Sequence, residues 1–454
     1  MSQWKKVKIG DICKIVKGTT GIASAEPGQY PLVVTAEERK TCSSYQFDCE
    51  AVCIPLVSSS GHGKKSLKNV HYQNGKFALG TILCAVIPNN PDELDARFLH
   101  QYLQFYKDTV LVPLMKGAAN VSLSMKDIAT VEFPLPPIEK QRELSNLFIT
   151  LQEKQKELTA ETEQQLEYTK LLRQNILQDA IEGKLTVEWR KSHPVIKGNP
   201  DYDAEALFEK IQKGEVSPSL QPDKPSSATP SAGSNAARNA RSKKMSPITA
   251  EEKPFEIPEG WIFTRLGEIS EIVRGGSPRP AGDKTYYDGD IPFLKVADLT
   301  GSNEKELYQF TYTIKEAGLK KTRLVEKETL MLTNSGATLG IPKICMIQTT
   351  FNDGIAAFLG IYERILKDYL YYFLKSKTKW FLKEAAKGQG QPNLNTDIVS
   401  GTILPLPPLK EQEEIVNKIE SLLAKVTELE NQIQERKTLS EKLAFGIIKE
   451  KLEG

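Results

Sequence analysis

Residues 133–141 read FPLPPIEKQ, and residues 404–412 read LPLPPLKEQ, so one proline-rich segment occurs twice in this 454-residue chain. Proline disfavours helix in the residue before it and fits the first turn of a helix, so each segment predicts a helix start. Glu182-Gly183 recurs at the same offset as Glu453-Gly454. The chain therefore contains one unit twice, and each unit ends in a helix.

A second repeat marks the start of each unit. Residues 4–18 read WKKVKIGDICKIVKG, and residues 261–275 read WIFTRLGEISEIVRG. The offset between these segments differs from that between the proline-rich segments, so the interiors of the two units have diverged in length and sequence. Matching ends around diverged interiors predict one scaffold that carries two specificities.

Between the repeats, each unit has a mixed α and β pattern. Short apolar runs at 81–87 and 329–332 predict strands, and 98–106 and 369–377 predict one matching helix in each unit. The expected fold class is α+β, with two globular mixed α/β domains separated by two long helices. We predict a first globular domain at 1–138, a first helix at 139–183, a connector at 184–255, a second globular domain at 256–409 and a second helix at 410–454.

Both long helices repeat apolar residues at heptad spacing, which is typical of a coiled coil. The register matches between the copies, but the middle of the first helix is polar. We call the apolar heptad positions of each helix its seam. A symmetric homodimer would not need one strongly apolar seam and one partly polar seam, so we predict an intramolecular antiparallel coiled coil of about 60 Å. The alternative is a coiled coil that serves only oligomerisation. The predicted seam comprises Leu144, Phe148, Leu151, Leu158, Leu172, Ile176, Ile415, Ile419, Leu422, Val426, Leu429, Ile433, Leu443 and Ile447.

The connector loses its pattern from about residue 197. Residues 217–231 are rich in proline and serine and cannot bury a core. Residues 203–213 predict a short amphipathic helix with Leu207, Phe208 and Ile211 facing inward. The basic residues between 238 and 244 suit either a solvated linker or a nucleic-acid contact.

Composition places limits on location and on metal binding. No apolar run approaches the length of a membrane span, and the first residues lack a signal-peptide pattern, so we expect a cytoplasmic protein. Cys42, Cys49, Cys53 and His62 suggest a zinc site, but they contain no C-x2-C pair. Reduced, partly buried thiols are the expected state, and no metal is predicted.

Charge is unevenly distributed along the chain. The net charge is +3 for residues 1–138 and +1 for residues 256–409, but −3 for 139–183 and −2 for 410–454. A nonspecific nucleic-acid binder would show a stronger basic excess. If the chain binds DNA, it does so through local patches in the globular domains.

Several glycine-rich loops have the chemistry for such patches. Lysine and backbone N–H groups suit phosphates, while Gln and Asn suit the paired donor and acceptor edge of adenine. Glycine-rich loops are also common simple turns, and Lys17 and Arg274 precede a glycine at equivalent positions, which equally suits a structural role. The candidates are Lys17, Lys64, Lys65, Lys68, Lys116, Asn120, Arg274, Arg279, Lys295, Asn334, Ser335, Lys343, Lys387, Gln389 and Gln391.

No catalytic motif is complete. Residues 61–66 lack the first glycine of a P-loop. Residues 199–202 read NPDY, which departs from the Asn-Pro-Pro-Tyr motif of amino-methyltransferases at the second proline. No nucleophile and base pair stands out among the four histidines, so the chain is predicted to be non-catalytic.

The duplicated set of motifs resembles the specificity subunit of Type I restriction-modification enzymes. The resemblance rests on residues 256–269 (EIPEGWIFTRLGEI), both Pro-Leu-Pro-Pro helix entries and residues 391–394 (QPNL), and it covers the whole chain in the family's order. It implies that each globular domain recognises one half of a bipartite DNA site and that the helices set the gap between the halves. The Pro/Ser-rich connector is longer than in many members.

The resemblance also implies partners. Modification subunits, two in number, would bind along the helices and methylate adenine with S-adenosylmethionine, and restriction/translocase subunits would cleave DNA with ATP and Mg. No cofactor is expected in this chain. Two other hypotheses remain open: a coiled-coil adaptor that binds protein and not DNA, and the detached reader of a single-polypeptide restriction-methyltransferase.

Overall fold

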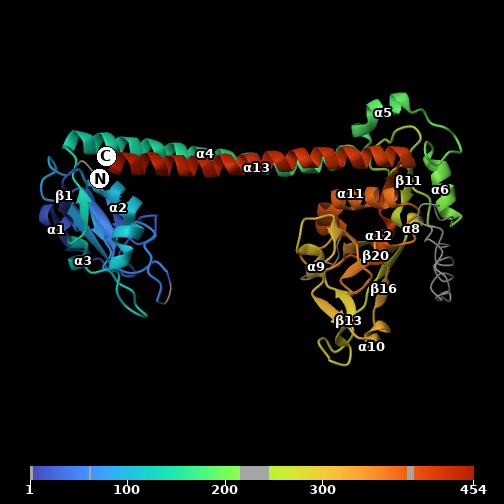
Figure 1. The fold of residues 1–454 in the computed structure, drawn as a ribbon, viewed down its shortest axis with the longest axis horizontal. Helices are drawn as coiled ribbons and strands as arrows, with labels where there is room; N and C mark the ends of the chain where they lie inside the picture. Colours follow the sequence, from blue (N-terminus) through green and yellow to red (C-terminus); the bar gives the residue numbers. More distant parts are fainter. Residues whose placement is uncertain (1–3, 61–62, 215–244, 386–392, 454) are drawn as a thin grey trace. The chain divides into compact units, whose positions relative to one another are not determined.

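The computed structural model describes residues 4–60, 63–214, 245–385 and 393–453. The chain divides into two compact units, one formed by residues 1–165 with 432–454 and the other by residues 166–431. Both boundaries cut through the long helices α4 (Ile138–Ile181) and α13 (Leu409–Glu453), so each unit holds one globular domain and part of each helix (Figure 1). No helix in these ranges is long and apolar enough to span a bilayer.

The first domain contains two four-stranded sheets. One has the order β2 (Cys13–Lys17), β9 (Leu83–Pro88), β6 (Ala51–Pro55), β7 (His71–Gln73), and the other β4 (Lys40–Cys42), β3 (Tyr30–Val33), β8 (Lys76–Leu79), β5 (Phe47–Asp48). The helices are α1 (Ile9–Ile12), α2 (Ala96–Val110), the 3-10 turn η1 (Val112–Leu114) and α3 (Met125–Ala129).

The second domain repeats this arrangement. Its larger sheet has the order β12 (Glu271–Arg274), β20 (Ile355–Leu359), β17 (Thr329–Thr333), β18 (Pro342–Cys345), β14 (Glu306–Leu307), and its smaller sheet β15 (Tyr312–Ile314), β13 (Tyr287–Leu294), β19 (Thr349–Phe351), β16 (Arg323–Val325). The helices are α8 (Leu266–Ile269), α9 (Val296–Thr300), α10 (Glu316–Leu319), α11 (Arg364–Trp380), the π-helical η4 (Phe381–Ala385) and α12 (Thr396–Gly401).

The two domains share one topology. In the first, β3 runs parallel to β8 and antiparallel to β4; in the second, β13 runs parallel to β19 and antiparallel to β15. Strand β14 has no counterpart in the described part of the first domain. The prediction of one scaffold in two copies is confirmed, and the helices expected at 98–106 and 369–377 are α2 and α11.

The first and last strands of each domain pair with each other. Strand β1 (Lys6–Lys8) is antiparallel to β10 (Glu132–Pro134), and β11 (Ile262–Arg265) is antiparallel to β21 (Ile403–Leu406). Each ladder leads through a proline-rich turn directly into a long helix. The repeated ends of the sequence are therefore neighbours in space, which explains why both ends match between the copies.

A buried glutamine fixes each turn to its helix. Gln141 Nε2 donates to the carbonyl of Pro136, and Gln412 Nε2 donates to the carbonyl of Pro407, both over 2.8 Å. Neither glutamine is exposed. Gln141 also donates to Glu93 and accepts from the backbone N–H of Asp95, which caps α2.

The two long helices run antiparallel. In the first unit, Ser440 donates to Gln155 over 3.0 Å, and Arg436 lies 3.0 Å from Glu161. In the second unit, Arg173 contacts Glu430 over 2.7 Å. Later positions on α4 thus face earlier positions on α13, and the predicted antiparallel pairing is confirmed.

The predicted seam is correct in part. Leu144, Phe148, Ile176, Ile415, Ile419, Val426 and Ile433 are buried, and Leu151, Leu158, Leu422 and Ile447 are half-buried. Three positions are wrong: Leu172, Leu429 and Leu443 are 43%, 43% and 65% exposed. On α4 the contact line passes from buried Thr169 to Arg173, which contacts Glu430, and returns to the heptad at buried Ile176.

The described part of the connector is ordered. It forms η2 (Lys184–Thr186), α5 (Val187–Ser192) and α6 (Ala204–Gln212), which is the predicted short helix. Leu207 and Ile211 are buried in the core of the second domain, and Phe208 packs at its edge. The short helix predicted at 203–213 is therefore confirmed, and residues 193–203 before it are irregular. The low-complexity segment and the basic residues 238–244 lie outside the described residues.

The NPDY segment has a structural role at the start of α13. The backbone N–H groups of Leu409 and Lys410 donate to the carbonyls of Pro200 and Asp201, both over 3.1 Å. These are N–H groups that a helix cannot satisfy within itself. The connector thus caps the second long helix.

Replacing Gln141 should destabilise the chain more than replacing Gln412. Gln141→Ala removes three hydrogen bonds and Gln412→Ala removes one, so we expect losses in unfolding free energy of about 3 and about 1 kcal/mol. Urea denaturation of the full chain, followed by circular dichroism, measures both. Equal losses would contradict the assigned hydrogen-bond roles, because the volume removed is the same.

Candidate nucleic-acid interface

In each domain, two loops meet at one end of the larger sheet. In the first, the loop after β6 joins the loop at 116–122, because Ser58 N–H donates to Val121 O over 3.0 Å. In the second, the loop after β17 joins the segment that begins at residue 393, because Ser335 pairs with Asn393 and Leu394 N–H donates to Asn334 O. The predicted loops are therefore brought together in pairs at equivalent positions.

Lys17 and Arg274 lie at the same end of their sheets. Lys17 pairs with Cys84 and Arg274 with Ala356, at the starts of the equivalent strands β9 and β20. The following glycines are sterically required: a Cβ on Gly18 would lie 2.2 Å from the carbonyl oxygen of Gly80. Lys17 is exposed, whereas Arg274 Nε donates to the carbonyl of Asp353, so the shared position has different roles in the two copies.

The first domain presents an uncompensated cationic loop. Lys64, Lys65 and Lys68 are exposed, and none forms an ion pair within the described ranges. The Ser58 hydroxyl holds the loop by donating to Lys64 O and accepting from Ser66 N–H.

Lys116 and Asn120 border this loop and are both exposed. The Lys116 ammonium lies 3.0 Å from the Asp127 carboxylate. Hydrogen bonds from the Ser124 hydroxyl and, to a smaller extent, from the Lys116 ammonium lower the pKa of the Asp127 carboxyl. Lys116 is thus the one cation of this group that already has a carboxylate partner.

The corresponding loop of the second domain is polar. Asn334 is fully buried, and both polar atoms of its side chain lack a hydrogen-bond partner, while Ser335 is half-buried. Arg279 is exposed, and the Lys295 ammonium lies 3.3 Å above the centre of the Tyr312 ring. The loop at 334–341 contains no lysine or arginine, unlike the equivalent loop of the first domain.

Lys343 does not lie on the exposed surface of these loops. Its side chain is 2% exposed, and its ammonium donates to both oxygens of Ser302 and to the carbonyl of Glu304. Its position in β18, an interior strand between β17 and β14, directs the side chain into the domain, which residue type alone does not show. Lys387, Gln389 and Gln391 lie outside the described residues.

The cysteines are thiols in apolar surroundings. Burial raises the pKa values of Cys13 and Cys84 to about 12, so both are protonated at neutral pH. Within the described ranges, no three His, Cys, Asp or Glu side chains are grouped so as to hold a metal ion, and His62 lies outside these ranges.

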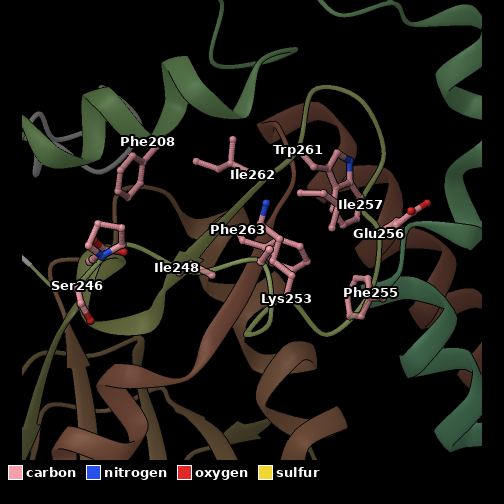
Figure 2. A pocket seen from close by; sticks show the side chains of 13 residues that line it. Phe208, Ser246, Ile248, Lys253, Phe255, Glu256, Ile257, Trp261, Ile262 and Phe263 are labelled. Carbon is pink, nitrogen blue, oxygen red and sulfur yellow. The ribbon is translucent and has the colours of Figure 1, made fainter.

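A cavity of about 960 Å³ lies between α6 and the segment that enters the second domain (Figure 2). Apolar side chains dominate its wall, including Phe208, Phe255 and Trp261. Of its acidic residues, Glu268 already accepts hydrogen bonds from Thr264 and from the backbone of Arg265. The cavity marks where the connector packs on the domain.

Comparison with known proteins shows to which family the chain belongs. The model of the Type I restriction modification DNA specificity domain matches residues 1–168 and 258–436, one match for each copy of the repeat. The chain belongs to this family.

Two relatives illustrate the match. The chain is 28% identical to the MjaIX specificity subunit of a Type I restriction enzyme from Methanocaldococcus jannaschii, over 43% of this chain and 44% of that one. It is 24% identical to the EcoDI specificity subunit from Escherichia coli, over 95% of this chain and 83% of that one.

Solved structures share the fold. A chain from a study of assembly and conformational transition of a type I R-M system has a TM-score of 0.62 at 18% identity, covering 99% of this chain and 98% of that one. The HsdS subunit from Thermoanaerobacter tengcongensis has a TM-score of 0.56 at 17% identity, covering 99% and 97%.

One candidate surface of this specificity protein was missed from sequence. Tyr308, Phe310 and Tyr312 are 58%, 44% and 43% exposed in and beside β15. Exposed aromatic rings next to a lysine can stack on nucleic-acid bases. The sequence alone could have indicated this surface. Aromatic and polar residues alternate at 308–312, and in a strand this pattern places all three rings on one face.

The loop lysines should carry the salt dependence of DNA binding. Replacing Lys64 and Lys65 by Gln should lower the slope of log affinity against log salt by about one for each phosphate that the variant no longer neutralises. Fluorescence anisotropy of the assembled complex with its duplex measures this slope. The matched control replaces Lys154 and Lys156 of α4, which are equally exposed; an equal change in both double variants would contradict the assignment.

Proposed function

We propose that this chain is the sequence-specific DNA-recognition subunit of a Type I restriction-modification complex, and that each globular domain reads one half of a bipartite site. The observation that carries this proposal is the repeated topology with different loops at the same end of the sheet. The first copy has a cationic loop. The second has a polar loop at the equivalent position and, in and beside β15, exposed aromatic side chains. These differences suit two different half-sites.

In this proposal the helix pair sets the number of unread base pairs between the half-sites. The pairing of α4 with α13 through buried apolar and threonine side chains supports a ruler of fixed length. Half-sites about one helical turn apart, ~34 Å, suit such a ruler.

The chemistry belongs to partner subunits. Adenine must be flipped out of the duplex to be methylated, so the reader holds the flanks while another chain acts on the base. We assign S-adenosylmethionine to two modification subunits, and ATP and Mg to restriction subunits, with no cofactor in this chain. The complex would act in the cytoplasm.

Matched shortening of the helices tests this function. Deleting residues 153–159 and 437–443 removes one heptad from each of two facing segments, as the contacts of Gln155 with Ser440 and of Glu161 with Arg436 show. About 10 Å of helix is removed, which corresponds to about three base pairs. Sequencing of methylated sites should show the same half-sites with a shorter gap, and altered half-sites would refute the ruler.

The exposed leucines of α4 support docking of a partner. Leu171 and Leu172 are 52% and 43% exposed on one turn of the helix. Replacing both by Asp should leave the unfolding temperature of this chain within a few degrees, because neither side chain is buried, but weaken binding of the modification subunit at least tenfold. Surface plasmon resonance measures the affinity, and Glu163→Lys on an exposed part of α4 is the control. Unchanged affinity in the double variant would place the partner elsewhere.

A further inference from the structure

A cationic cavity of about 840 Å³ lies within the second unit. One wall is formed by α4 and α13, and the other by α11, the start of β18 and residues 300–304. Helix α11 runs beside α13 (Figure 1). The Tyr372 hydroxyl of α11 donates to Glu420 of α13. The charged residues of the wall are Lys170, Arg173, Lys343, Lys375 and Lys379, with the carboxylates Glu304 and Glu430.

One of the two carboxylates is already neutralised. Arg173 forms a two-pronged contact with Glu430, with Nε to Oε1 at 3.0 Å and Nη2 to Oε2 at 2.7 Å. Glu304 is the other carboxylate of the wall, and the Lys170 ammonium already lies 2.6 Å from Glu167 outside the wall. The cavity keeps an excess of positive charge.

The two innermost lysines have no carboxylate partner in the described ranges. Lys343 uses all three of its ammonium protons on Ser302 and Glu304 oxygens, so it contributes charge but no free donor. The Lys375 ammonium donates to the Tyr371 hydroxyl over 3.2 Å and keeps two protons for another acceptor.

This arrangement is costly without an anion. Burial lowers the pKa of Lys375, and the charges of Lys343 and Arg173 lower it further. A buried charge is stabilised by an opposite charge with hydrogen bonds. With Arg173 paired to Glu430 and Lys170 to Glu167, Glu304 is the one wall carboxylate left for Lys343, Lys375 and Lys379. The Lys379 ammonium donates to Gln174 over 2.8 Å and keeps two protons. An anion between Lys375 and Lys379 would satisfy free protons on both lysines and offset the repulsion.

We propose that this cavity is a binding site for a phosphate-bearing anion, with Lys375 and Lys379 as donors and Lys343 as a fixed charge behind them. Phosphate oxygens accept charge-assisted hydrogen bonds from lysine, and the cavity is large enough for a nucleotide. The phosphate comes from a free phosphorylated molecule or from a DNA backbone. The site does not depend on the proposed DNA-reading function, since a free phosphate ligand binds without DNA.

Calorimetric titration of the full chain with inorganic pyrophosphate tests the site directly. We expect one molecule bound per chain, and an affinity at least about tenfold weaker for Lys375→Gln. Lys425→Gln, on an exposed part of α13 outside the cavity, is the matched control and should bind like the unchanged chain. The unfolding temperature of each variant is also measured, so that a loss of binding can be distinguished from a loss of folding.

A second arm separates the two sources of phosphate. In one outcome pyrophosphate does not bind, but Lys375→Gln reduces the slope of log DNA affinity against log salt by about one in the assembled complex. The ligand is then a phosphate of the DNA backbone. If Lys375→Gln changes neither measurement, the proposal is overturned. If the complex binds no DNA while the chain binds pyrophosphate, the proposed DNA-reading function fails and the anion site stands.

Discussion

The structure depends on the joint between the last strand of each domain and its long helix. The ladders β1–β10 and β11–β21 close each domain on itself, and Gln141 and Gln412 then tie the proline-rich turns to α4 and α13. Because a proline-rich turn has few conformations and its carbonyl is held by a buried amide, the direction in which each helix leaves its own domain is fixed. The same joint made twice produces two related units from one chain.

Each long helix is also anchored at its far end. The last turns of α4 pack in the core of the second domain with Trp261, and Leu452 of α13 packs in the core of the first. Beside the first of these anchors, the buried carboxylate of Glu411 accepts hydrogen bonds from Arg190, Thr186 and Trp261. In each unit, one long helix leaves the domain through its joint and the other packs into the domain's core, while the loops at the sheet ends are free to diverge.

Periodicity and repetition predicted the fold well, and individual side chains poorly. The duplicated ends, the antiparallel helices and helix α6 follow from patterns that backbone geometry imposes. The burial of Lys343 was not predicted because it depends on tertiary packing. The exposure of Leu172, Leu429 and Leu443 was not predicted because a heptad pattern does not show where the helices meet through polar pairs such as Arg173 with Glu430 and Gln155 with Ser440. The cation cluster around Lys375 joins three segments far apart in sequence, so no local pattern could reveal it.

The most direct test is a genome-wide map of N6-methyladenine in a methylation-free host that expresses this chain with its modification subunit. The account predicts a two-part motif with an unread gap, and predicts that replacing residues 1–138 by the equivalent domain of a relative changes one half of the motif and leaves the other half unchanged. A stable complex that adds no methylation, or a domain exchange that changes both halves together, would contradict it.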